Sequence, residues 1–477
     1  MTSLNTNGLP IVWKDGEDQA QRDLYERHRN RTACSNRSNR YPLAVVRPKT
    51  IEHIVQAVKL AQEHGARIAV RGGGHSFSAW SVRDNSILID MVDYRRLNYN
   101  ETTQILEVSP SITGSQIVPY LKQFGRFAPT GHCPSVGVGG FALQGGMGIH
   151  ANGVGYICEY VEAVDVVTAA GDVLHCDKDN NEELYWAARG AGPGFPAIVT
   201  SFHIRTIERF KSTTAFVYMY PIKEYDAVMP WLLKINALQS PNTEIIVSFD
   251  NRDASPMYSI LCYFGVSGES DDEVGAELQR WRDWAPPGAW QTIGPLPEGF
   301  EYLYKMVGEE DYTGKDTGPR FTGLNMFLRD DCDMLEVCRE SFTTLPRGTW
   351  AYWEPMAPHS NKKIDDMAFT MNYDRYVAIY THHLRKEDDE YFDKWLKKQM
   401  EPLLPYSYGA YLGDACFTRQ PTKYWSDEAY ARLMRIRRKW DPSGRICGYL
   451  TKGDVPGEND LTNKLAEPVS VFPRKSL

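Results

Sequence analysis

The stretch RGGGHSFSAW (residues 71–80) places three glycines directly before a histidine, where a short apolar segment ends. Glycine loses more backbone freedom on folding than other residues, so three in a row indicate a sharp turn or a close approach to another group. The backbone N–H groups of such a loop can turn outward and bind an anion such as a phosphate. Neither a Walker motif nor a G-x-G-x-x-G follows, and a glycine-rich turn with an incidental histidine explains the pattern equally well.

A second stretch, TGHCPSVGVGGFALQGGMG (residues 130–148), raises the same question about Cys133. Nine of the 25 residues from 131 to 155 are glycine, and we expect irregular backbone throughout this segment. Residues 137–142 match G-x-G-x-x-A, but the prolines just before them exclude the central strand that a Rossmann fingerprint needs. Taken alone, Cys133 is either a buried thiol or a nucleophile that requires a base from elsewhere.

Composition narrows the class of protein. The 477 residues are too many for one ordinary core, and 42% hydrophobic with 24% charged residues is typical of a soluble globular protein of two or three lobes. The net charge of −8 and the lack of a basic cluster argue against nucleic acid or an anionic membrane as partner, and no apolar run is long enough to span a membrane. Nine cysteines without a C-x-x-C pair argue against structural zinc and against a disulfide framework, so we expect no metal.

The beginning of the sequence has neither a basic segment nor an apolar core of the kind found in secretory signals, so we expect a cytoplasmic protein. Three N-x-S/T sequons, at Asn30, Asn36 and Asn100, leave secretion open if a leader was removed.

Hydrophobic periodicity predicts an α+β fold in two lobes. The first lobe is expected to contain helices at 51–64, 115–124 and 182–188, strands at 67–71, 86–90, 105–109 and 197–206, and a hairpin at 164–176. From about residue 210, long strands (214–220, 244–249 and 257–264) and helices (224–238 and 270–284) predict an antiparallel sheet backed by helices. A last helix is expected at 426–440. We divide the chain into residues 1–208, 209–405 and a C-terminal segment, 406–477.

Other candidate functional residues lie in aromatic stretches. Glu354 lies within AYWEP and Tyr411 within PYSYGAYLGD, where tyrosines more often pack or form hydrogen bonds than catalyse. His382 and His383 are neighbours on a strand-like run, so their side chains point to opposite faces and make a poor metal pair.

Several segments together resemble the vanillyl-alcohol-oxidase/p-cresol-methylhydroxylase (PCMH) superfamily, and more closely the berberine-bridge-enzyme-like oxidases. The resemblance extends over nearly the whole chain, and the histidine and cysteine motifs in tandem are its most specific part. The segments that carry it are YPLAVVRP (41–48), VRGGGHSF (70–77), GHCPSVGVGG (131–140), QGGMG (144–148), VDVVTAAG (164–171), LYWAARG (184–190) and RRKWDP (437–442).

The resemblance implies a PCMH-type FAD-binding lobe built from the N- and C-terminal segments, with the middle of the chain as a roof over the substrate. In such proteins the histidine bonds the flavin 8α-methyl group and the cysteine bonds C6 of the ring, which here are His75 and Cys133. It also implies that the glycine-rich loops wrap the pyrophosphate and ring edge, with Ile198 near the adenine. The residues expected to bind the cofactor are Arg71, Gly72, Gly73, Gly74, His75, Ser76, Cys133, Gly137, Gly139, Gly140, Gly145, Gly146, Gly148 and Ile198.

Oxidation of an alcohol or amine carbon needs a group that takes the hydroxyl or amine proton. The candidates are Tyr411, Glu354, Asp414 and Tyr373, where a tyrosinate serves as base only if its pKa is lowered. The chain departs from the family here: Tyr411-Leu-Gly413-Asp414 has glycine where Y-x-N is usual. The residues that follow the glycine-rich segment, 149–158, and the segment AFTMNYDR (368–375) also depart from the usual family patterns.

These features predict a bicovalent FAD oxidase that oxidises an alcohol or amine carbon of a small organic substrate, a secondary metabolite, and passes electrons to O₂. Two alternatives stay open on the same scaffold, a secreted oligosaccharide oxidase and a dehydrogenase or redox-neutral enzyme. An aromatic roof with Tyr352, Trp353, Tyr373 and Tyr376 tolerates a sugar or a planar metabolite. We expect a monomer or homodimer.

Overall fold

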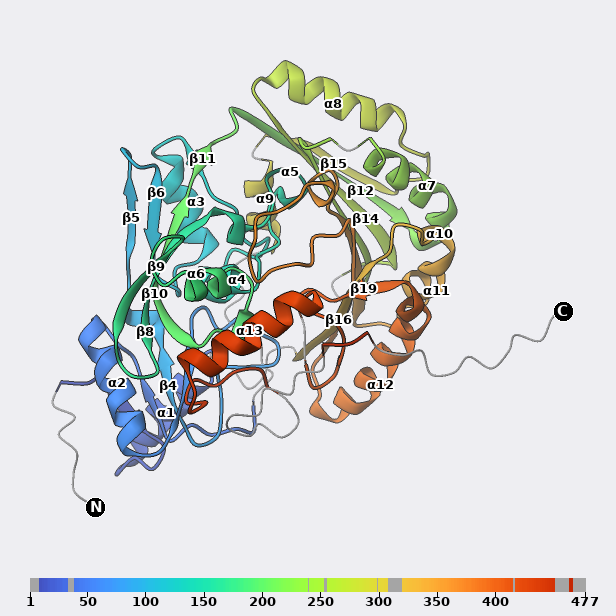
Figure 1. Ribbon diagram of the computed structural model, residues 1–477. Coiled ribbons are helices and arrows are strands. Elements are labelled where there is room, and N and C mark those ends of the chain that lie inside the picture. The colour runs from blue at the N-terminus through green and yellow to red at the C-terminus, as the bar shows by residue number, and fades with distance from the viewer. Residues whose placement is uncertain are drawn as a thin grey trace.

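Two groups of β-sheets face each other across the molecule, as the computed structural model shows (Figure 1). The structure describes residues 8–32, 38–238, 240–252, 255–297, 299–307, 320–414, 417–450 and 463–465. The N-terminal part of the chain, up to β10 (Ala197–Arg205) and coloured blue to green, forms one side and the middle of the chain forms the other, and the C-terminal helix (red) returns to the first side. Asn36, Cys34 and Cys416 lie outside the described residues.

The first side begins with a four-stranded sheet in the order β1-β2-β4-β3. Its members and the helices that accompany it are β1 (Ile11–Trp13), α1 (Gln19–Arg29), β2 (Ala44–Val46), α2 (Ile51–Glu63), β3 (Arg67–Arg71) and β4 (Ser86–Asp90). The α2 helix forms because Thr50 caps its first turn and its apolar stripe is buried against the sheet. A distant segment adds to this sheet: Ile68 N–H donates to Arg445 O at 2.7 Å, and Cys447 N–H donates to Ile68 O at 2.7 Å.

A five-stranded antiparallel sheet, in the order β5-β6-β10-β8-β9, lies next to it. The strands and accompanying helices are β5 (Leu97–Asn100), β6 (Ile105–Val108), α3 (Gly114–Lys122), β8 (Val161–Thr168), β9 (Val173–Asp177), α6 (Glu182–Ala188), β10 (Ala197–Arg205) and α13 (Asp427–Trp440). Val167 and Ile198 contribute to the core of the four-stranded sheet, while Val166 and Phe202 belong to a second core with Trp186. Side chains that alternate along β8 and β10 therefore pack into both cores, which joins the two sheets into one lobe.

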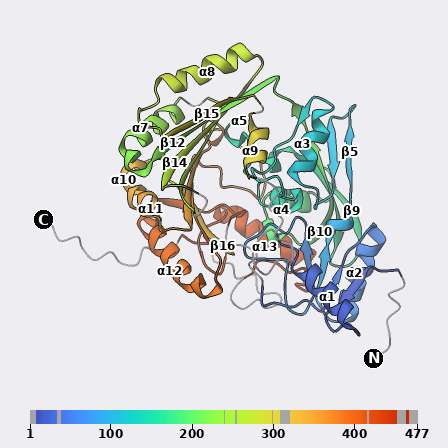
Figure 2. The ribbon, with the colours of Figure 1, turned by 180° about the vertical axis from the view of Figure 1, so that it is seen from behind.

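The opposite side is an eight-stranded antiparallel sheet in the order β15-β12-β14-β13-β17-β18-β16-β19. Its strands are β12 (Ser212–Pro221), β13 (Thr243–Asn251), β14 (Ser259–Gly268), β15 (Gln291–Leu296), β16 (Arg320–Leu328), β17 (Thr349–Pro355), β18 (Arg375–His383) and β19 (Ser407–Gly409). Its outer face is covered by α7 (Tyr225–Asn236), α8 (Asp271–Asp283), α10 (Met334–Val337), α11 (Arg339–Thr343) and α12 (Asp389–Met400), which Figure 2 shows from behind. The predicted α+β architecture of two lobes, with an antiparallel sheet backed by helices, is confirmed.

The glycine-rich segment is more regular than the sequence predicts. The prediction of irregular backbone is wrong for two segments, which are helical: α4 (Val138–Leu143) and the single turn α5 (Ala151–Val154). Phe141 and Ala142 are buried in the core of the first lobe, and this burial outweighs the roughly 1 kcal/mol that each helical glycine costs. The remaining described elements are β7 (Arg126–Phe127), β11 (Ile207–Glu208) and α9 (Phe300–Val307), along with short 3-10 turns.

None of the seven cysteines among the described residues forms a disulfide. None of the helices in this part of the chain is both long enough and apolar enough to cross a membrane. The limits predicted at residues 208 and 405 stay predictions.

Candidate active site

A cavity of about 540 Å³ lies between the glycine-rich loops of the first lobe and the inner face of the eight-stranded sheet. The loop after β3 and the segment around α4 form one wall, and side chains of β13, β14, β17 and β18 form the other. The predicted residues that line it are Arg71, Gly72, Gly73, Gly74, His75, Ser76, Cys133, Gly137, Gly139, Gly140, Glu354, Tyr411 and Asp414. Two motifs separated by about 60 residues therefore meet at one site.

The two glycine loops touch each other through their backbones. A Cβ on Gly73 would lie 2.6 Å from Gly137 N, and one on Gly137 would lie 2.6 Å from Gly73 Cα. On Gly139 it would lie 2.5 Å from Pro110 Cβ, so a side chain at these positions would push the loops apart. Gly140 differs, because a Cβ there meets nothing within 4 Å and the residue lines the cavity. Glycine at 140 keeps open a space that a side chain would fill.

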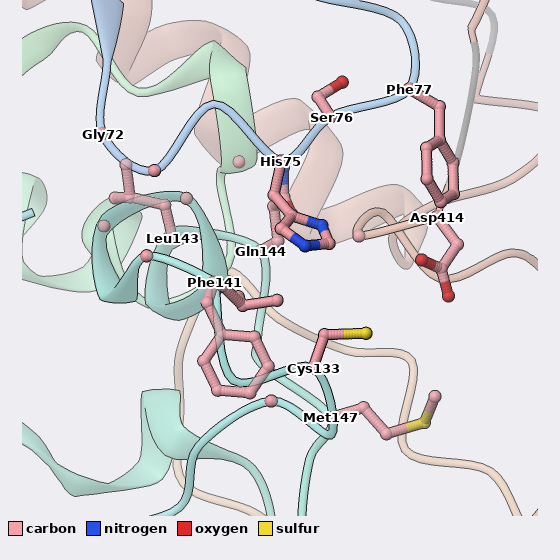
Figure 3. Close-up of a pocket in the computed structure, with 18 of the residues that line it drawn as sticks. Gly72, His75, Ser76, Phe77, Cys133, Phe141, Leu143, Gln144, Met147 and Asp414 are labelled. Carbon is pink, nitrogen blue, oxygen red and sulfur yellow. The ribbon is translucent and has the colours of Figure 1, made fainter. Parts of the chain in front are cut away.

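His75 and Cys133 open into the same space. Figure 3 shows the imidazole and the thiol projecting from different loops into one part of the cavity. His75 Nε2 lies 3.2 Å from Ser135 Oγ, and burial lowers the pKa of His75 to about 4. The imidazole is therefore neutral near pH 7, so one ring nitrogen keeps a lone pair available for bonding.

Arg71 has a different environment from the one that an anion-binding residue would have. Its guanidinium donates to Asp90 Oδ2 at 2.8 Å and to Arg29 O at 2.8 Å, and its side chain is 1% exposed. Its charge is thus neutralised by a buried carboxylate, which also accepts from Arg31. Arg31 in turn donates to Gly72 O at 2.6 Å and to Gly73 O at 3.1 Å. The arginines hold the glycine loop in place and Arg71 does not present free charge to the cavity.

Other predicted site residues do not line the cavity. Gly145, Gly146 and Gly148 pack against protein, since a Cβ on each would lie within 2.6 Å of Phe369, Ile157 or Thr130. The side chain of Ile198 is buried in the core of the four-stranded sheet, and its neighbours Ala197 and Val199 line the cavity instead.

Two aromatic residues expected in the roof are also elsewhere. Tyr373 stacks on Tyr408 with ring centroids 4.1 Å apart, outside the cavity. Trp353 belongs to the core under the helices, because residues alternate along β17 and its neighbours Tyr352 and Glu354 take the cavity face.

An acid–base cluster lies at the cavity wall beside Cys133. His132 Nε2 lies 2.9 Å from Glu244 Oε1 and 3.8 Å from Glu354 Oε1. Burial alone would lower the pKa of His132, but the two carboxylates outweigh it and raise the pKa to about 9. Burial raises the pKa of Glu354 to about 7, although the charge of His132 opposes this shift. Glu354 can thus take or give a proton near neutral pH.

Glu244 is the fixed anion of this cluster. Burial favours its neutral form, but His132 and the N–H of His150, which donates at 2.8 Å, hold its pKa below the usual range. His132, Glu244 and Glu354 also have the residue types and spacing that can hold a metal ion, as do Asp165, His175 and His203 on the five-stranded sheet away from the cavity. The raised pKa of His132 favours proton sharing at the first group, because a metal ligand needs the neutral imidazole.

Tyr411 does not meet the condition for a tyrosinate base. Burial and the nearby Asp414 raise its pKa, and its hydroxyl accepts the N–H groups of Gly146 and Met147 at 3.1 Å each. The phenol therefore keeps its proton. The glycine at 413 has a local reason, since a Cβ there would lie 2.3 Å from Tyr411 Cε1.

Asp414 is a buried acceptor for two phenols. Tyr376 donates to its Oδ2 at 2.5 Å and Tyr380 donates to the same atom at 2.9 Å. Burial raises the pKa of Asp414, and the two hydrogen bonds with the charge of His132 counteract this in part. The contacts tie the carboxyl to the sheet and leave Glu354 as the better-placed base.

Sequence reasoning missed the role of His132 and did not identify Glu244. His132 directly precedes the cysteine motif, so its place in the cavity could have been inferred from Cys133. Glu244 gave no signal, because its partner is 112 residues away in sequence and its strand reads as ordinary sheet.

The open space at Gly140 and the His75 and Cys133 side chains that project into one cavity fit an FAD bound in this cavity, within reach of both side chains. These features define a flavoprotein of the PCMH type. The family described as FAD binding domain matches residues 42–177. An FAD-linked oxidoreductase from Penicillium janthinellum, janO, is 37% identical over 458 residues, 95% of this chain and 99% of that protein.

Solved structures show the same fold. A berberine-bridge-enzyme-like protein of Physcomitrella patens has a TM-score of 0.78 at 17% identity, covering 93% of this chain and 96% of that one. The xylooligosaccharide oxidase from Myceliophthora thermophila, solved with xylobiose, has a TM-score of 0.78 at 21% identity, covering 96% and 98%. The chain belongs to the FAD-linked oxidoreductases, and its fold is that of the berberine-bridge-enzyme-like structure. It is an FAD-dependent enzyme.

Proposed function

We propose that the enzyme is an oxidase that carries FAD on two covalent bonds, through His75 and Cys133, and oxidises an alcohol or amine carbon of a small organic substrate. The observation that carries the proposal is that both side chains open into one cavity whose other wall presents Glu354. When bound, FAD supplies a hydride acceptor at N5, and its reoxidation by O₂ releases H₂O₂.

The protein's own contribution is proton transfer and positioning. Glu354, with its pKa near 7, takes the proton of the substrate hydroxyl or amine as the carbon is oxidised. His132 stands beside it as a cation held by Glu244, so the ionised carboxylate is stabilised inside the cavity. The hydroxyl of Tyr411 has its lone pairs engaged by two backbone N–H groups, so its hydrogen is available to a substrate oxygen.

Covalent attachment is tested by acid precipitation followed by mass spectrometry of flavin-bearing peptides. Wild-type protein should precipitate yellow, with flavin on both the His75 and the Cys133 peptides. His75→Ala and Cys133→Ala should each keep flavin through the remaining bond, and the double variant should release it. Cys447→Ala, which removes another thiol of the same cavity, is the matched control and should keep both bonds. Flavin retained by the double variant would overturn the proposal.

Oxidase activity is tested with a panel of alcohols and amines by H₂O₂ release, with O₂ consumption measured in parallel. Reduction of the flavin without H₂O₂, followed by reoxidation in air over many minutes, would favour a dehydrogenase instead.

A further inference from the structure

Three polar side chains on the cavity face of the eight-stranded sheet are buried without a hydrogen-bond partner among the described residues. They are Ser248 on β13, Tyr263 on β14 and Trp350 on β17, with 4%, 1% and 6% of their surfaces exposed. All three line the cavity. A buried donor without a partner costs free energy comparable to a lost hydrogen bond, so such groups are seldom left unpaired when a protein is at work.

The three lie on adjacent strands and on one face. Tyr263 pairs in register with Ile246, and Ser248 pairs with Leu261 on one side and Tyr352 on the other. Trp350 is two residues from Tyr352 on β17, so it points to the same face. We call Ser248, Tyr263 and Trp350 the donor group.

The surface around the donor group is apolar. Ile246, Leu261 and Leu303 line the same part of the cavity. Arg252, which also lines the cavity, is paired with Asp250 at 2.6 Å, so its charge is already compensated. A ligand that is complementary to this wall is therefore uncharged and largely apolar where it contacts these side chains.

The chemistry of the donor group specifies what that ligand carries. An indole N–H only donates, and serine and tyrosine hydroxyls can both donate, so acceptor oxygens on the ligand satisfy the donor group. Trp350 is four residues before Glu354 on the same strand, which places it about 13 Å along the sheet from that carboxyl group. An acceptor that binds Trp350 therefore lies far from the carbon next to Glu354.

We propose that the donor group is a recognition site for a neutral, mainly apolar substrate, which bears an ether, carbonyl or hydroxyl oxygen remote from the carbon that is oxidised. The inference rests on the proposed function for the position of the reacting carbon. An oligosaccharide fits this wall poorly, because Ile246, Leu261 and Leu303 would leave several of its hydroxyls without partners.

The test measures binding, with naphthalene, 2-methoxynaphthalene and cellobiose as probes in ligand-observed NMR titrations of the flavin-loaded protein. The methoxy compound differs from naphthalene by one acceptor oxygen and a methyl group, and 2-ethylnaphthalene controls for the added size. A hydrogen bond to this oxygen should make 2-methoxynaphthalene bind on the order of tenfold more tightly than 2-ethylnaphthalene. Cellobiose should bind more weakly than both.

Variants of the donor group test whether it causes the preference for 2-methoxynaphthalene. Ser248→Ala, Tyr263→Phe and Trp350→Phe remove one donor each, and the triple variant should lose the preference for the methoxy compound while it still binds 2-ethylnaphthalene. Thr381→Val is the matched control, because Thr381 also has a buried hydroxyl without a partner among the described residues but lies outside the cavity. It should leave the preference unchanged.

Three results would overturn the inference: no preference in the wild-type protein, a preference that persists in the triple variant, or cellobiose as the tightest ligand. If the triple variant does not fold, the three single variants decide, and an unchanged preference in all of them counts against the site. A different result would contradict the proposed function. Flavin released by acid from the wild-type protein would exclude the covalent bonds, and it would not change these binding measurements.

Discussion

His132 Nε2 lies between two carboxylates, 2.9 Å from Glu244 Oε1 and 3.8 Å from Glu354 Oε1. One imidazole therefore links a fixed, buried anion to the carboxyl group that faces the substrate space. Because Glu244 also accepts the His150 N–H, its charge is held in place, and the cation on His132 is held with it. This arrangement explains how a buried carboxyl group can still ionise near neutral pH.

Replacement of the base should slow oxidation without removing the flavin. We expect Glu354→Gln to lower the rate of flavin reduction by substrate about 10²- to 10⁴-fold, since the amide cannot take the proton. The measurement is anaerobic stopped-flow reduction, and covalent flavin content checks that the site is intact. Tyr411→Phe is the comparison: it removes a donor but no base, so its loss should be smaller. A Glu354→Gln variant as fast as wild type would exclude Glu354 as the base.

The pH dependence follows from the pKa of about 7 at Glu354. The carboxyl must be ionised to act as base, so kcat/KM should rise with pH and level off above about 7. In His132→Gln the neighbouring positive charge is lost, and the pKa of Glu354 should rise. The rise of kcat/KM should therefore move to higher pH. His203→Gln, on the five-stranded sheet away from the cavity, should leave the profile unchanged. If kcat/KM rises at lower pH in His132→Gln than in wild type, this would contradict the electrostatic role given to the imidazole.

Adjacent glycines of α4 should behave differently when alanine replaces them. At Gly139 the new methyl group would lie 2.5 Å from Pro110 Cβ and 2.9 Å from Pro110 Cα, so Gly139→Ala should lower the free energy of unfolding by about 1–3 kcal/mol. At Gly140 the methyl group enters open cavity, so Gly140→Ala should fold normally and lose flavin content instead. Thermal unfolding and the flavin-to-protein absorbance ratio separate the two effects. Equal loss of stability in both variants would argue against the space assigned to the cofactor.

Local patterns in the sequence predict the parts of the fold and site that local forces determine. The cap at Thr50 and the stripe from Ile54 to Ala61 are enough to predict α2, whereas the cavity wall at His75 and Cys133 is predicted from the family resemblance that their motifs carry. Which face of a strand turns to the cavity is decided by the packing of whole layers. For this reason Trp353 was expected in the roof, although it is its neighbours on β17 that lie there.

Glycine motifs are ambiguous for a related reason. A glycine can be required by a cofactor or by another part of the protein, and the sequence does not distinguish them. Gly140 faces open cavity, whereas Gly137 and Gly139 make room for Gly73 and Pro110, and Gly145, Gly146 and Gly148 for Phe369, Ile157 and Thr130. Long-range pairs such as His132 with Glu244 leave no local trace at all.

The glycine loop after β3 depends on the buried carboxylate of Asp90, which contacts Arg71 at 2.8 Å and Arg31 at 2.5 Å. Burial disfavours the charge on Asp90, but the two guanidinium groups outweigh it and hold its pKa far below the usual range. Asp90→Asn would leave Arg71 buried beside a neutral amide, and we expect it to lower the free energy of unfolding by about 3–5 kcal/mol. Flavin content should fall too, because Arg31 would lose the anchor from which it holds Gly72 and Gly73.

The sign of the pH effect follows from the direction of that pKa. A carboxyl group in the unfolded chain titrates near about 4, so the contribution of Asp90 is fully present above this pH and is lost as the pH falls toward its lower folded value. Urea unfolding at several pH values should therefore show wild type and Asp90→Asn converging in acid. Asp93→Asn removes a nearby, partly exposed pair with Arg47 and should cost less than about 1 kcal/mol. If Asp90→Asn proves no more costly than Asp93→Asn, the buried ion pair is not what holds the glycine loop.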